Sequence, residues 1–340
     1  MKKLFTATTA LVFVVLICGV AFLGCEGEEG PVGPGADSSG SCGSCHNVTT
    51  SVLAKQVQYQ NSVHYTGGHG GYGTRNSCSE CHSHEGFEAY VTTGETGLVF
   101  EDSTPPNCRT CHNIHENYDE TDYSMSTMTA VITSPMLADI PEATNFGKGN
   151  VCANCHRARE RELELVVGGV DVVVDHLDPH HGPQANILAG FGAFEIEGSL
   201  PYINSSHTTA VTDGCVTCHM GDNSRNTSGG HTFIVNETGC AAAACHSDIE
   251  DIEDYRGAQD EISELLEELA VLLVADSLVV LDEDDPEDFL ESDSIEDQTV
   301  SSAKAGAILN FYFVVEDKSL GIHNFKYSKA LLQNSIEVFE

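Results

Sequence analysis

The chain has 340 residues and carries 52 acidic against 15 basic side chains, a formal net charge of −37. A surface this acidic repels phosphate backbones, so nucleic-acid binding is excluded, and a cationic partner, a metal ion or simple solubility is expected instead. The length permits one or two ordinary domains, but the chain lacks Trp and its first two thirds are rich in Gly, Ser, Asn and Thr, so a conventional apolar core would be thin there.

The N-terminus, residues 1–24, has the pattern of an export signal. Lys2 and Lys3 precede an uncharged, mostly apolar stretch over residues 4–24. Its end, Phe22-Leu23-Gly24-Cys25, resembles a bacterial lipoprotein processing box, which implies that Cys25 becomes the lipidated N-terminus. Without processing, the stretch is long enough to anchor the chain in a bilayer. Both routes predict an exported, membrane-anchored protein, and the lipoprotein route predicts the outer membrane, on its periplasmic face or at the cell surface.

Residues 25–41 are predicted to be a tether. They contain Gly-Pro-Val-Gly-Pro-Gly and no periodic apolar pattern, which is typical of a flexible linker. A collagen-like triple helix is excluded because the run is too short to sustain one.

From Cys42 onward the chain repeats one short motif. Cys-x-x-Cys-His occurs five times, and a version with four alanines between its cysteines follows. This is the signature of covalent c-type haem attachment, in which two thiols bond the porphyrin and the next His ligates the iron. The sequence therefore predicts six haems c. The predicted attachment residues are Cys42, Cys45, Cys78, Cys81, Cys108, Cys111, Cys152, Cys155, Cys215, Cys218, Cys240 and Cys245, and the predicted proximal iron ligands are His46, His82, His112, His156, His219 and His246.

Zinc sites and disulfides also use paired cysteines. Zinc knuckles combine two such pairs, or one pair with a separate His pair, and do not need a His after every pair. Disulfides and thioredoxin-like motifs are natural in an exported chain, but a thioredoxin-like motif normally occurs once, next to a strand-helix unit. For the stretched motif the alternative is a local disulfide, or two free thiols, beside His246.

The motif-bearing region, residues 42–250, is predicted to fold around its haems. The motifs begin at irregular intervals, which argues against a solenoid of fixed period. Macrocycles would replace much of the usual side-chain core, with thioether bonds acting as staples. We expect a mainly α fold with low regular secondary structure, organised around six covalently bound haems. Residues 163–167 and 170–174, separated by Gly168 and Gly169, add a small predicted β-hairpin.

The C-terminal part, residues 251–340, carries no haem motif. Apolar residues recur at helical spacing from Ile262 to Leu273 and predict an amphipathic helix. Ten of the sixteen residues from Asp282 to Asp297 are acidic, which predicts a solvated loop, because the ordered ligand spacing of a calcium loop is missing. Two further helices are predicted over residues 302–315 and 324–339. We expect this part to form a helical clamp against the haem region.

Spare histidines decide whether each iron gains a second ligand. Six of the sixteen His are proximal, so ten remain, more than six irons need. Histidine is favoured over Met as the second ligand, and it would keep the reduction potentials low. The spare histidines are His64, His69, His84, His115, His176, His180, His181, His207, His231 and His323.

Several stretches resemble the multihaem c-type cytochromes of metal- and mineral-respiring bacteria, including relatives of the multihaem nitrite and tetrathionate reductases. The similar stretches are residues 79–87, 108–115, 179–185, 204–207, 215–220, 229–233 and 321–324. The resemblance implies distal iron ligation by His64, His115, His176, His180 or His181, His207, His231 and His323, with His69 and His84 as bystanders. Seven positions for six irons leave one over, or one of them serves a haem in a neighbouring molecule.

The first functional hypothesis is electron transfer through six bis-His haems in anaerobic or extracellular respiration, without enzymatic activity. Its partners would be redox proteins such as other multihaem cytochromes, or extracellular acceptors such as metals. An alternative is a terminal reductase of a small nitrogen or sulfur oxyanion, although the Cys-x-x-Cys-Lys motif of nitrite reductases is missing. A second alternative is a homo-oligomer, the subunit of an extracellular cytochrome filament, in which the surplus His ligates a haem of the next copy.

Overall fold

The fold was analysed in a computed structural model that describes residues 46, 51–67, 71–76, 78–132, 143–158, 171–174, 177–222, 227–241, 245–247, 249, 252, 255–281, 289–290 and 298–340. Residues 1–47 and 48–340 form separate units, and all that follows concerns the second. The predicted export signal and tether lie outside the described residues, as do Cys42, Cys45, His69 and His176. The domain boundaries at residues 24, 41 and 250 stay predictions.

Short helices carry the described motifs. The helices before residue 250 are α2 (Ser51–Gln60), α3 (Val63–Thr66), α4 (Ser79–His82), α5 (His84–Thr93), α6 (Cys108–Cys111), α7 (Asn150–Ala153), α8 (Gln184–Ala189), α9 (His207–Ala210), α10 (Cys215–His219) and α11 (Glu237–Cys240). Local capping explains several of their starts. Asn107 forms a capping box with Thr110 at α6, and Asn236 accepts a hydrogen bond from the Gly239 N–H at α11. Three longer helices follow, α12 (Ala258–Ala275), α13 (Ser302–Asp317) and α14 (Phe325–Ile336), so the predicted mainly α fold is confirmed.

The strands of the described residues are only two residues long and pair antiparallel. Val131–Ile132 (β1) pairs with Ala143–Thr144 (β2), Val172–Val173 (β3) with Thr299–Val300 (β6), and Val280–Leu281 (β4) with Phe289–Leu290 (β5). The first arm of the predicted hairpin lies outside the described residues, and its second arm contains β3. Of the acidic run, only β5 is described, and it is a strand rather than a loop.

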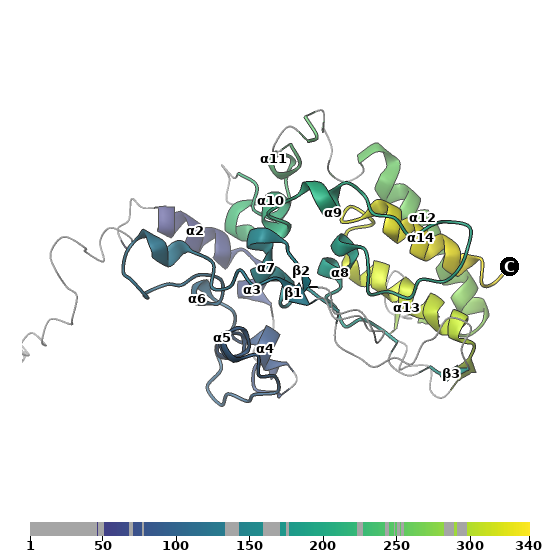
Figure 1. The fold of residues 1–340 in the computed structure, drawn as a ribbon, viewed down its shortest axis with the longest axis horizontal. Coiled ribbons are helices and arrows are strands. Elements are labelled where there is room, and N and C mark those ends of the chain that lie inside the picture. Colours follow the sequence, from purple (N-terminus) through teal and green to yellow (C-terminus); the bar gives the residue numbers. More distant parts are fainter. Residues whose placement is uncertain are drawn as a thin grey trace, which may run out of the picture. The chain divides into compact units, whose positions relative to one another are not determined.

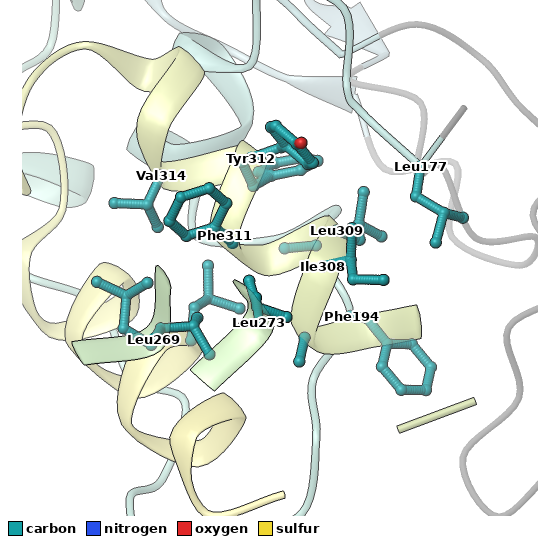
Figure 2. Close-up of a cluster of buried hydrophobic side chains, with 14 of the residues drawn as sticks. Leu177, Phe194, Leu269, Leu273, Ile308, Leu309, Phe311, Tyr312 and Val314 are labelled. Atoms are coloured by element: carbon teal, nitrogen blue, oxygen red, sulfur yellow. The ribbon is translucent and has the colours of Figure 1, made fainter. Parts of the chain in front are cut away.

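One apolar core holds the C-terminal helices together. Helices α12, α13 and α14 pack against one another, as Figure 1 shows in green and yellow, and α8 packs on α13. Figure 2 shows Leu269 and Leu273 of α12 beside Phe311 and Val314 of α13, all of them almost fully buried. The core also contains side chains from the motif-bearing region, so it joins that region to the C-terminal helices; they are Ala158, Val174, Leu177, Ile187, Ala193, Phe194 and Ile196. The C-terminal part is therefore an integral half of one core.

A close backbone approach fixes residues 193–196 on α13. A Cβ on Gly306 would overlap the ring of Phe194, so only glycine lets the helix come this near. Asn310, one turn further on, accepts a hydrogen bond from the Phe194 N–H at 2.9 Å and donates one to the Phe194 carbonyl oxygen at 2.8 Å. This buried amide satisfies two backbone groups that have no strand or helix partner there.

The first described motifs lie in a region with almost no apolar core. Among described residues 51–130, Phe87 is the single buried apolar side chain. Nine of the fifteen exposed large apolar side chains of the described chain come from the same stretch, among them Val63, 77% exposed, and Tyr118, 67% exposed. Exposed apolar surface at this density is unfavourable in water unless another apolar body covers it.

Candidate haem sites

Four motif histidines each face a second histidine that is remote in sequence. The distances between ring centroids are 5.9 Å for His156 and His64, 6.0 Å for His112 and His231, 6.1 Å for His219 and His323, and 5.8 Å for His246 and His207. In every pair, one member follows a Cys pair and the other is a spare histidine for which the sequence predicts a distal role. The pairing itself was beyond the reach of the sequence.

These separations fit an iron atom between the two rings. Metal–imidazole bonds of about 2 Å place the two ligating nitrogens about 4 Å apart and the ring centres roughly 6 Å apart. The Nε2 atoms of His207 and His246 are 3.5 Å apart, slightly less than this. Stacked or hydrogen-bonded imidazole rings would have no reason to repeat one separation in four unrelated places.

In three of the facing histidines, a backbone carbonyl oxygen contacts the other ring nitrogen. Nδ1 of His112 lies 2.9 Å from the Tyr123 carbonyl oxygen, Nδ1 of His219 lies 2.9 Å from the Phe233 carbonyl oxygen, and Nδ1 of His207 lies 2.7 Å from the Ile322 carbonyl oxygen. A carbonyl can only accept a hydrogen bond, so each Nδ1 carries the proton and each Nε2 keeps its lone pair for a metal. This is the arrangement that fixes a histidine ligand in its binding tautomer.

Burial keeps several of the facing imidazoles neutral, as metal ligands must be. Burial lowers the pKa of His156 and of His219 from its usual value. Burial, helped by the positive charge of Lys55, lowers the pKa of His231 to about 4. These three rings are therefore uncharged at neutral pH.

Each distal candidate is positioned by its own local element. His64 lies in α3, His207 begins α9, and His231 lies in a 3₁₀ turn over Gly230–Thr232. That turn is tied to α2, because the N–H of His231 donates to Gln58 Oε1 at 3.0 Å. His323 lies in the connection between α13 and α14, so the C-terminal part contributes a facing histidine although it has no Cys motif.

Thiols of different motifs are neighbours. Cys155 is in side-chain contact with Cys81, and Cys152 with Cys215. Glycine makes one of these approaches possible, since a Cβ on Gly149, just before α7, would lie 3.3 Å from the Cys215 sulfur. The fourth motif is thus in contact with both the second and the fifth.

The third and sixth motifs join the same cluster. Cys111 lies close enough to Cys152 and Cys155 to help raise their pKa values, after the larger effects of thiol hydrogen bonding and burial. The pKa of Cys218 is raised to about 11, first by burial and then by Cys240 and neighbouring thiols. The described cysteines are all free of disulfides, so the disulfide alternative gains no support from them.

The other described histidines for which the sequence predicts a role in iron ligation lie outside the four facing pairs. His82 packs against Tyr72 with ring centroids 5.2 Å apart, and His115 stacks on Tyr118 at 5.6 Å. His180 and His181 lie next to each other, with ring centroids 5.0 Å apart, and Nδ1 of His181 is 3.1 Å from a carboxylate oxygen of Glu316.

His84, expected to be a bystander, lies buried with its Nδ1 3.3 Å from the Thr110 hydroxyl. Within the described part of the chain, no cluster of three or more His, Cys, Asp or Glu side chains is arranged to hold a metal ion. Two histidines per iron need no such cluster, because a porphyrin supplies the other four ligands.

No protein-family model matches the chain, and no curated protein matches it. Among solved structures, the fold is similar to that in the crystal structure of the outer cell wall cytochrome OcwA, with a TM-score of 0.51 and 18% sequence identity. The match covers 84% of this chain and 50% of OcwA, so the chain spans about half the length of that protein. The fold is thus of the multihaem cytochrome kind. The number of haems and their ligands stay predictions.

Proposed function

We propose that this chain is an exported electron-transfer protein that carries six c-type haems, each held between two histidines. The single observation that carries the proposal is the set of four facing histidine pairs with ring centroids 5.8 to 6.1 Å apart. The exposed apolar side chains of residues 51–130 support it, because porphyrin faces would cover them.

In this role the polypeptide binds, orients and spaces its cofactors. Haem supplies reversible one-electron chemistry at iron when it is bound. The Cys pairs would fix each ring covalently, the facing histidines would occupy both axial positions, and the backbone carbonyls at Nδ1 would hold those histidines in register. Two axial protein ligands leave no position for a substrate, which is why we propose a carrier rather than an enzyme.

The contacts between thiols support a continuous path. The second, third and fifth motifs each neighbour the fourth, through Cys81, Cys111 and Cys215. The fifth neighbours the sixth through Cys218 and Cys240. Cofactors attached to these cysteines would be held at short distances from one another, so the fourth motif would be a branch point of the path.

Location and partners follow from the N-terminal pattern and the charge. The lipoprotein-like box at Cys25 would anchor the chain in the outer membrane. OcwA is described as an outer cell wall cytochrome, which agrees with an exported role for a chain of similar fold. The net charge of −37 favours a basic redox protein or a metal as partner.

Intact mass combined with a redox titration tests the proposal. Six covalent haems and six low-potential centres are expected from protein purified out of a host that matures c-type cytochromes. A Cys152→Ala/Cys155→Ala variant should lose one haem mass, while Cys18→Ala, in the predicted signal, should lose none. Colourless protein with the mass of the bare polypeptide would overturn the proposal.

Two measurements separate the alternatives. Reduction of nitrite, hydroxylamine or tetrathionate by the dye-reduced protein, faster than by free haem, would favour the oxyanion reductase. Filaments of this protein in sheared cell-surface material would favour the filament subunit. An electron carrier is expected to show neither.

A further inference from the structure

The connection between α13 and α14 supports two facing histidines in two different ways. The Ile322 carbonyl oxygen accepts from His207 Nδ1 at 2.7 Å, whereas a carboxylate oxygen of Asp317 lies 2.6 Å from His323 Nδ1. Each of the four facing pairs has an Nδ1 contact to a neutral backbone or amide oxygen. In the His219–His323 pair, His323 in addition has a carboxylate at its Nδ1.

Asp317 is placed so that its charge acts on His323. The residue is 1% exposed and ends α13. The Ser319 hydroxyl donates to its other oxygen and also accepts from the His323 N–H at 3.2 Å, so the three residues form one small network. The nearby cation Lys318 pairs with Glu316 instead, at 3.9 Å.

A buried carboxylate that shares the Nδ1 proton makes the imidazole a stronger electron donor at Nε2. Because the carboxylate is out of water, solvent screens its negative charge only weakly.

We propose that Asp317 is a positioning residue that lowers the reduction potential of the iron held by His219 and His323. This inference rests on the proposed function. One electron enters, from a reduced viologen in the test below, and no proton moves, since the Nδ1 proton stays between His323 and Asp317 in both oxidation states. Asp317 opposes that electron by its charge and so favours the oxidised form.

The location of this centre gives the inference a consequence for electron flow. Cys215 touches the fourth motif and Cys218 neighbours the sixth, so the fifth motif lies between them. Asp317 would therefore make the step onto this centre, in the middle of the path, less favourable.

The test is a redox titration of the full-length protein with all its haems, with reduced viologen as the electron donor and EPR as the readout. The centre of interest is the one whose low-spin signal disappears in His323→Ala. Asp317→Asn keeps the shape and an accepting oxygen but removes the charge, and it is expected to raise this midpoint so that reduction becomes about tenfold more favourable, equal to about 59 mV for a one-electron couple. The other midpoints should not move.

Two matched variants guard the result. Glu316→Gln removes one negative charge from the adjacent residue, which pairs with His181 and Lys318, and it should leave the midpoint in place. Ser319→Ala removes a hydrogen bond to Asp317, so the carboxylate should bind His323 more strongly and the midpoint should fall. The midpoint is thus expected to rise in Asp317→Asn and to fall in Ser319→Ala. A general loosening of the fold would not shift it in opposite directions.

Failure of this inference is distinguishable from failure of the proposed function. A protein without haem gives no titration at all, which refutes the function. A six-haem protein whose midpoints are the same in Asp317→Asn and in the parent refutes only the role of Asp317. Equal shifts in Asp317→Asn and Glu316→Gln would also refute it, because they would show a general charge effect.

Discussion

His64 and His156 face each other with ring centroids 5.9 Å apart and ring planes at 82°. His64 lies in the single turn of α3, and His156 ends the fourth Cys motif. The second and third motifs lie between them in the sequence. Gln184 reaches the outer side of this pair, with its Oε1 3.3 Å from His156 Nδ1. Three further pairs repeat this geometry, so the fold as a whole brings histidines together in twos at the spacing of a bis-His iron site.

Ring orientation predicts two kinds of low-spin EPR signal. The planes are nearly perpendicular in His64–His156, at 82°, and in His207–His246, at 88°, but they are tilted by only 36° in His112–His231 and 39° in His219–His323. Perpendicular imidazoles make two iron orbitals nearly equal in energy and give a strongly anisotropic signal, while more parallel ones give a rhombic signal. A spectrum of the oxidised protein in which all centres belong to one kind would contradict the ring geometry.

Removal of one facing histidine should open one iron. In His231→Ala, the iron attached at the third motif loses its second ligand, so one centre should become high-spin and bind carbon monoxide on reduction. His84→Ala is the control, because His84 is also buried but faces Thr110 rather than a motif histidine. Resonance Raman spectra should show a five-coordinate marker in the first variant and not in the second. A five-coordinate marker in both variants would contradict the assignment of His231 as an iron ligand and His84 as a bystander.

Asn310 is expected to contribute strongly to the stability of the C-terminal core. Asn310→Ala leaves the N–H of buried Phe194 without a partner and leaves its carbonyl oxygen with the Ile196 N–H alone, so the free energy of unfolding should fall by about 2–3 kcal/mol. Urea unfolding monitored by circular dichroism measures it. Asn61→Ala removes a single hydrogen bond from an exposed side chain to the Val57 carbonyl, and it should cost less than about 0.5 kcal/mol. Similar losses in both variants would mean that the buried amide has no special role.

Protein made without haem should be ordered in one half only. The C-terminal helices pack around a large apolar core, to which side chains between Ala158 and Ile196 also contribute, whereas described residues 51–130 bury Phe87 alone among apolar side chains. Hydrogen exchange of haem-free chain should therefore show protection in α12, α13 and α14 and fast exchange over residues 51–130. Equal protection of both regions would show that residues 51–130 fold without the cofactor.

A steric prediction concerns Gly306. A Cβ at this position would overlap the Phe194 ring, so Gly306→Ala should destabilise the fold by about 1–3 kcal/mol. Gly71→Ala is the matched control, since a Cβ there has open space around it. The two variants are compared by their midpoints of urea unfolding, and an unchanged midpoint in Gly306→Ala would mean that Phe194 moves aside at little cost.

Local pattern was sufficient for the elements whose cause is local. The apolar spacing from Ile262 to Leu273 is that of the helix α12, and the helices predicted over residues 302–315 and 324–339 correspond to α13 and α14. Composition indicated a thin apolar core in the first two thirds of the chain. This holds for described residues 51–130, where Phe87 is the one buried apolar side chain, but not for the described residues from Val131 to Ile196, which contribute to two apolar clusters. The strand β5 inside the acidic run was not foreseen, because Phe289 and Leu290 are too few to give a periodic signal.

The amino-acid order specifies which cysteines occur as pairs, which histidine follows each pair, and that spare histidines exceed the irons they would serve. Folding specifies that His231 faces His112, that His323 faces His219, and that Asp317 contacts His323. A covalent attachment motif consists of consecutive residues and can be recognised in the sequence, whereas the facing histidine is brought into place by packing between distant segments. The connection between α13 and α14 is positioned by the apolar core around these helices. The spacing of residues along the chain therefore does not predict which motif histidine His323 faces.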